Sequence, residues 1–235
     1  DEKIRRNVDE AVAREDAADA MLWLDMARRL GIPIAGGIEA AAYALKARED
    51  SLETQFSDYV SGFVAGSSDS IAGLAGAVTS DLTVYGDLRD ILGEGGKMLA
   101  GEEYSEFILG LSVVGLAATA GTVATGGGGV VVKAGISFVK FAKRAGHMTA
   151  AFAARLTRLA GDAVDLPAFR QTLRRLDLAD PAGSWKILTD YAATVRSAHI
   201  FDVLGKLEGI RQTVGTTEAL RLLKRMEKIE DVDDV

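Results

Sequence analysis

The sequence predicts an all-α protein, a multi-helix bundle built around a glycine-rich apolar helical hairpin at residues 107–142. Apolar residues recur three and four positions apart through most of the chain, which is typical of amphipathic helices. Glycines and the three prolines mostly stand between these stretches. No set of alternating runs is long enough to form a sheet. We expect about nine to eleven helices in three regions, residues 1–35, 36–146 and 147–235.

The composition restricts the classes of function. The chain has 235 residues, of which 48% are hydrophobic, and its mean hydropathy of +0.13 lies at the apolar edge for a soluble protein. It has no cysteine, which excludes disulfides and thiolate chemistry. The net charge of −7 and the lack of an aromatic stacking platform argue against nucleic acid as a partner. The charged opening Asp1-Glu2-Lys3 does not fit a signal peptide.

Residues 1–35 are predicted to form two helices with a break near Glu15. The second helix ends at Arg28 and Arg29, because basic residues favour a last turn and Pro33 cannot continue a helix. The first region therefore forms a helical hairpin.

The central region starts with a helix that begins near Gly37 and continues to about Phe63. Residues 70–80 are expected to form a helix without charge. A further helix is expected from Asp81 to Leu92, and the glycines within residues 93–96 are expected to end it.

The apolar hairpin is the strongest candidate for a functional segment. Residues 107–132 carry no charge. Residues 107–125 would span roughly 28 Å as a helix, close to the roughly 30 Å of a bilayer's hydrocarbon core. The glycines at 126–129 permit a tight reversal. The second helix, residues 130–145, has two lysines seven positions apart that share one face.

Small side chains in this hairpin allow helices to approach closely. A helical hairpin also satisfies its backbone amides internally, as hydrocarbon requires. The pattern therefore favours lipid or a tight helix interface. The alternative is a buried central helix in a soluble bundle, where small residues also permit close packing. The candidate packing residues are Phe107, Gly110, Gly115, Ala117, Gly121, Thr125, Gly126, Gly127, Gly128, Gly129 and Phe138.

The charge changes sign across the hairpin. Seven acids and two bases lie between Asp81 and Glu106, whereas residues 107–161 contain six bases and no acid. Basic flanks favour the cytoplasmic side of a membrane, so the expected location is a bacterial inner membrane, with a soluble protein as the alternative. A solvated helix face would carry the same residues. The candidate contacts to lipid headgroups are Lys133, Lys140, Lys143 and Arg144.

The last region, residues 147–235, is predicted to be ordinary amphipathic helix. Thr149 can cap a helix, and Pro181 opens the longest stretch, which reaches Leu207. The acidic tail from Glu230 is expected to fray.

Motifs for catalysis are poor, and we predict no catalytic residue, cofactor site or metal site. Residues 93–98 lack the first glycine and the hydroxyl residue of a phosphate-binding loop. His199 and Asp202 can pair on one helix, but no nucleophile converges on them. Glu102 and Glu106 are either an acid-sensitive trigger for insertion or favourable charges near a helix start.

An all-helical body that encloses an uncharged helical hairpin resembles the pore-forming domains of colicins. The resemblance covers residues 37–160 and is one of architecture, without a shared motif. The chain differs in that Lys133 and Lys140 interrupt the second arm and the hairpin lies in mid-chain. The resemblance implies a pore-forming or membrane-disrupting protein.

The residues themselves indicate a non-enzymatic, membrane-associated protein. Its hairpin is expected to anchor it in lipid or to pack on partner helices in a homo- or hetero-oligomeric assembly. The third interpretation is a soluble helical enzyme or binding module, which a pocket with convergent polar groups would support.

Overall fold

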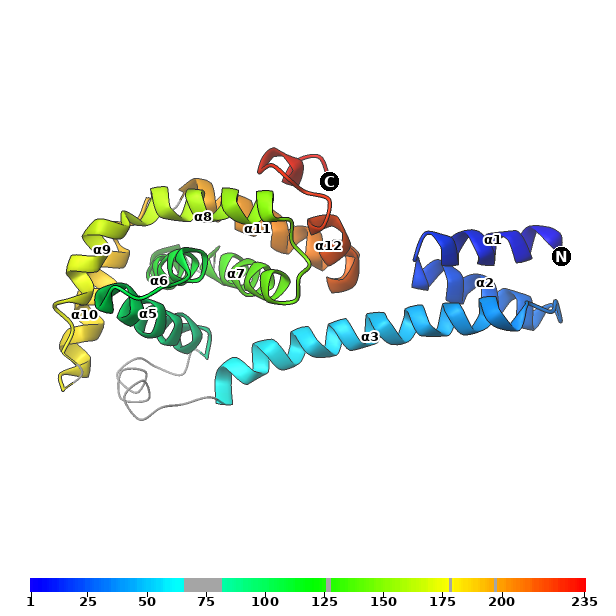
Figure 1. The fold of residues 1–235 in the computed structure, drawn as a ribbon, viewed down its shortest axis with the longest axis horizontal. Helices are drawn as coiled ribbons and strands as arrows, with labels where there is room; N and C mark the ends of the chain where they lie inside the picture. Colours follow the sequence, from blue (N-terminus) through cyan, green and yellow to red (C-terminus); the bar gives the residue numbers. More distant parts are fainter. Residues whose placement is uncertain (66–81, 126–127, 178, 197) are drawn as a thin grey trace. The chain divides into compact units, whose positions relative to one another are not determined.

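The all-α prediction is confirmed by a computed structural model, which describes residues 1–65, 82–125, 128–177, 179–196 and 198–235. Within these ranges the chain forms eleven α-helices and one short 3-10 helix, and no strand (Figure 1). The helix predicted at residues 70–80 lies outside the described residues.

The chain divides into two compact units, residues 1–57 and 58–235. The boundaries expected at 35/36 and 146/147 each fall inside one unit. Both units are helical, and each is described by itself.

The first unit contains α1 (Glu2–Ala13), α2 (Ala17–Arg29) and the beginning of α3 (Gly36–Ala65). The predicted break between the first two helices is confirmed. Glu15 adopts a left-handed conformation with φ of 57°, and the Asp16 side chain caps α2 by accepting a hydrogen bond from the Asp19 amide. Val8, Ala11, Ala20, Leu24 and Ala42 form the core of this unit.

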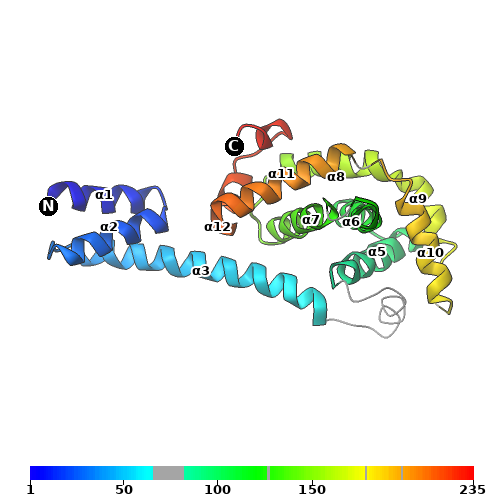
Figure 2. The same cartoon turned by 180° about the vertical axis from the view of Figure 1, so that it is seen from behind.

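The second unit contains the end of α3 and eight further α-helices, two of which form a central pair. They are α5 (Leu82–Ala100), α6 (Glu106–Thr125), α7 (Gly128–Arg144), α8 (Ala150–Val164), α9 (Leu166–Leu173), α10 (Pro181–Ala192), α11 (Ala198–Val214) and α12 (Thr216–Leu223). Helix α6 packs against α5, α7, α8 and α10, while α7 packs against α6 and α11 (Figures 1 and 2). We call α6 and α7 the central pair.

The prediction that glycines end α5 near Leu92 is wrong, because the helix continues to Ala100. Inside the helix Gly95 lies close to α9, where an added Cβ would lie 2.6 Å from the end of the Leu173 side chain. The helix ends instead at Gly101, whose φ of +75° favours glycine. Residues 93–98 are therefore helical and form no phosphate-binding loop.

Two expectations for the C-terminal region also need correction. The stretch from Pro181 is two helices, because α10 ends in a turn at residues 193 and 194 and the Arg196 amide donates to the Ala163 carbonyl at 3.1 Å. The acidic tail does not fray. The Asp231 carboxylate accepts hydrogen bonds from two backbone amides, and Val232 is buried. The predicted cap at Thr149 is confirmed.

Candidate functional site

Helix α6 is apolar on every side, and the protein's own helices cover it. All residues from Leu109 to Ala118 are buried, and the large side chains among them are at most 1% exposed. A helix without a polar face is stable only in a protein interior or in lipid. In the described form, packing inside the second unit removes α6 from water.

Three glycines of the central pair lie close to the surrounding helices. A Cβ at Gly110 would lie 3.0 Å from the Ala160 Cβ of α8. A Cβ at Gly115 would collide with the Asp87 carboxylate of α5, and one at Gly135 would collide with the Leu204 carbonyl of α11. Each glycine thus admits a different neighbour, and close packing holds the pair within the unit.

The structure places the remaining candidate packing residues as follows. Phe107, Ala117 and Phe138 are buried in the central pair. Gly128 and Gly129 lie in the first turn of α7 rather than in a turn before it. Gly126 and Gly127 lie outside the described residues, and so do the side-chain surroundings of Gly121 and Thr125.

A buried charged cluster joins three helices, and the sequence analysis did not identify it. The Lys140 ammonium of α7 lies 3.0 Å from Oδ1 of Asp87 and 3.1 Å from Oδ2 of Asp90, both on α5. It also donates a hydrogen bond of 2.7 Å to the Ser112 hydroxyl of α6. Lys140 is 1% exposed. Lys133, on the same face of α7, is also buried.

The sequence did contain a signal for this cluster. Asp87 and Asp90 stand three positions apart, so they share a face of the helix that also carries Leu88 and Ile91. Two acids among apolar residues on one helix, and two lysines seven positions apart on another, suggest mutual pairing. The choice between pairing and headgroup contact required the tertiary structure.

Burial and charge affect the two aspartates differently. Burial raises the pKa of Asp87 above its usual range, and the nearby Lys140 and Lys133 oppose this shift without cancelling it. Burial also acts to raise the pKa of Asp90, but Lys140 and Arg89 outweigh it and lower that pKa. The Arg89 guanidinium lies 2.9 Å from Asp90, at the edge of the cluster. Asp90 is therefore the better stabilised of the two carboxylates.

The contact between Ser112 and Lys140 superficially resembles a nucleophile beside its base. The charges argue against this chemistry. The Lys140 ammonium bridges two carboxylates and donates a hydrogen bond to the Ser112 hydroxyl, so it offers no lone pair that could accept the serine proton. Both side chains are also buried, so no substrate can reach them. The cluster is an internal ion pair that positions helices.

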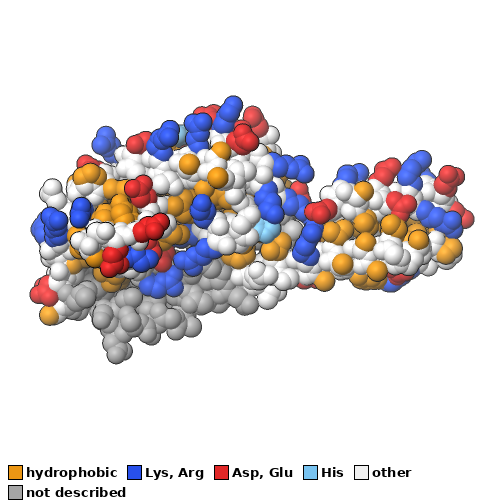
Figure 3. Space-filling view, viewed as in Figure 1, with side chains coloured by type: hydrophobic (Ala, Val, Ile, Leu, Met, Phe, Trp, Pro, Cys, Tyr) orange, Lys and Arg blue, Asp and Glu red, His pale blue; other side chains and the backbone are white. Residues whose placement is uncertain are grey.

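The two ends of α7 differ in character. Val130 and Val131, at its first turn, are 62% and 43% exposed. Lys143 and Arg144, at its last turn, are exposed and basic, and the Lys143 ammonium lies 5.8 Å from the centre of the Phe107 ring. The visible face of the molecule carries side chains of both charges, with hydrophobic side chains between them (Figure 3). Exposed apolar and basic residues thus lie at opposite ends of one helix.

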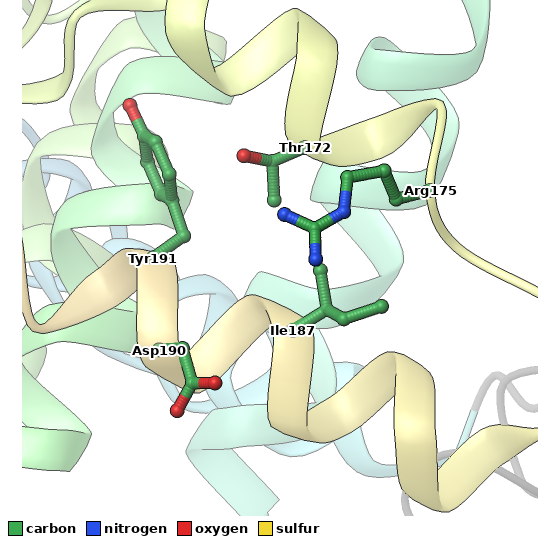
Figure 4. A pocket seen from close by; sticks show the side chains of 5 residues that line it. All are labelled: Thr172, Arg175, Ile187, Asp190 and Tyr191. Atoms are coloured by element: carbon green, nitrogen blue, oxygen red, sulfur yellow. The ribbon is translucent and has the colours of Figure 1, made fainter.

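A small surface pocket lies between α9 and α10 (Figure 4). Its volume of about 220 Å³ is below the range typical of ligand sites. Arg175 directs its guanidinium between Thr172 and Ile187, whereas the Tyr191 hydroxyl points away and donates to backbone carbonyls of Val164 and Asp165. The polar groups do not converge on one point, so the pocket does not define an active site.

The other titratable candidates are placed at the surface. Glu102 and Glu106 are both exposed. Asp202 pairs with Lys206 at 2.8 Å, and His199 is exposed. Across the part of the chain that the structure describes, no group of three or more acidic or histidine side chains is arranged to hold a metal ion.

One finding bears directly on the membrane expectation. Among the described residues, no helix combines the length and the apolar character that crossing a membrane requires.

The described arrangement is therefore an apolar helix, α6, paired with α7 and fixed by glycine contacts and a buried ion cluster. Comparisons with protein-family models, with curated proteins and with solved structures find no match to this chain.

Proposed function

We propose that the protein is a non-enzymatic helical protein that associates with membranes through the central pair. The single observation that carries this proposal is that α6 is apolar on every side. Its small and aliphatic side chains suit a protein interior and lipid equally, since neither contains water. Lipid or partner helices can therefore replace the helices that now cover it.

The polarity of α7 supports one orientation. Val130 and Val131 supply exposed apolar surface at one end, and Lys143 and Arg144 supply positive charge at the other. The two ends are roughly 18 Å apart along the helix, comparable with one leaflet of the roughly 30 Å hydrocarbon core. In this orientation the valines enter the lipid and the basic residues stay at anionic headgroups. No helix has to cross the membrane.

A second candidate function is a membrane-disrupting protein of colicin-like architecture. The observation that favours it is the enclosure of the central pair by α8, α10 and α11 (Figures 1 and 2). A protein of this kind stays folded in water and opens its helices in lipid. It differs from a simple anchor in making the bilayer leak.

Vesicle flotation tests the proposal. The chain is mixed with vesicles of phosphatidylcholine, with or without phosphatidylglycerol, and centrifuged through a density gradient. We expect the protein to float, and to float better with the anionic lipid. The double variant Val130→Asp/Val131→Asp should stay at the bottom, because it places charges where lipid contact begins. Both positions are exposed, so the variant should fold normally.

The matched control is Leu22→Asp, which changes a leucine that is 58% exposed in the first unit. It should float like the unchanged chain. The proposal is wrong if the unchanged chain does not float with either vesicle, or if the two variants float equally. Release of a trapped dye separates the two candidate functions, since an anchor leaves the vesicles intact.

A further inference from the structure

The buried charges of the central region belong to two helices and balance each other. Lys133 and Lys140 lie on α7, and Asp87 and Asp90 lie on α5. Lys140 touches both aspartates, and the charge of Lys133 also acts on Asp87. The ion pairs of Lys140 with the two aspartates are kept only if α5 stays beside α7.

Separating the helices would leave charges uncompensated on both sides. A lysine carried into lipid without an acidic partner is strongly disfavoured, and intramembrane charges accordingly pair with one another. The aspartates left behind would remain in an apolar interior without the lysine that now neutralises them. Both penalties are avoided if the two helices move together.

We propose that α5 enters the lipid together with α6 and α7, as the carrier of the acidic partners of the buried lysines. This inference rests on the proposed membrane association. The three-helix unit keeps the contacts of Lys140 with Asp87, Asp90 and Ser112. It also keeps the close approach of Gly115 to Asp87. The unit separates instead from α10 and from α8, α9 and α11. The last three contact it at Gly110, Gly95 and Gly135, and these contacts involve no ion pair of the cluster.

Three single-cysteine variants test the inference, since the chain has no cysteine of its own. Leu92→Cys places a label on α5, Thr119→Cys on α6 and Leu159→Cys on α8. All three positions are half-buried, so each accepts a small fluorophore such as bimane. The labelled full chain is mixed with phosphatidylcholine and phosphatidylglycerol vesicles that contain a doxyl-labelled quenching lipid.

We expect the labels on α5 and α6 to be quenched to the same extent and the label on α8 to remain bright. Quenching of the α6 label without the α5 label overturns the inference, because it shows that the central pair enters alone. Equal quenching of all three labels also overturns it. If none is quenched, the proposed membrane association itself fails, and this result is distinct from the other two.

A neutral cluster tests the physical reason. The variant Lys133→Met/Lys140→Met/Asp87→Asn/Asp90→Asn removes all four charges, and its circular dichroism shows whether it stays helical. Without charges to compensate, α5 has no reason to follow. The α6 label should then be quenched while quenching of the α5 label falls. Unchanged quenching of the α5 label would show that charge pairing does not couple these helices.

Discussion

Replacing Lys140 by methionine should strongly destabilise the second unit. Methionine keeps an unbranched side chain but leaves Asp87 and Asp90 without the ammonium that lies 3.0 and 3.1 Å away. Removing one partner of a buried ion pair lowers the free energy of unfolding by about 3–5 kcal/mol. We expect a loss in this range, because Lys140 is buried and serves two carboxylates.

Urea unfolding measures this loss. The chain has two tryptophans, Trp23 in the first unit and Trp185 in the second. In a Trp23→Phe background, fluorescence reports the second unit alone. The control Lys143→Met changes an exposed lysine on the same helix and should alter stability by no more than about 0.5 kcal/mol. A loss below about 1 kcal/mol for Lys140→Met, the level of a surface pair, would refute the argument from burial.

The pH dependence of this variant has a definite sign. The pKa of Asp87 is already raised in the folded chain, so its contribution to stability is present below the unfolded value of 3.8 and is lost as the pH rises through the folded value. Without Lys140 the upward shift grows. The stability deficit of Lys140→Met should therefore shrink as the pH is lowered from about 7 towards 4. A deficit that grows on acidification would contradict this assignment.

Three further predictions follow from single contacts. Gly115→Ala should lower the free energy of unfolding by about 1–3 kcal/mol, because its Cβ collides with Asp87. In the same urea assay, Gly209→Ala in α11 should raise the free energy of unfolding by about 0.5–1 kcal/mol, because no atom lies within 4 Å of the added Cβ. At neutral pH, Asp90→Asn should destabilise more than Asp87→Asn, since the pKa of Asp90 is lowered and that of Asp87 is raised; equal losses in urea unfolding would contradict this order. Burial and Asp165 raise the pKa of Tyr191 to about 12, so its contribution to stability is present below the usual value of 10.0 and is lost as the pH rises through about 12. An ultraviolet titration should show this phenol ionising at high pH, and the Tyr191→Phe variant should lack that step.

Local signals in the sequence predicted the helices well where they were strong. The break at Glu15, the cap at Thr149 and the end of the second helix before Pro33 depend on neighbouring residues, and all appear in the structure. The signal at residues 93–96 was misleading, because glycine both breaks helices and admits close neighbours. Gly95 serves the second purpose, which only the position of Leu173 reveals.

The sequence by itself determined that the protein is all-helical and that the charge-free stretch forming α6 has to avoid water. Periodicity and the absence of charge are local properties, and they act before the chain has a tertiary structure. Only the tertiary structure decided what shelters the apolar segment and where the lysines of α7 lie. Asp87 and Lys140 are 53 positions apart. Their pairing depends on how α5, α6 and α7 pack, and no local pattern specifies that packing.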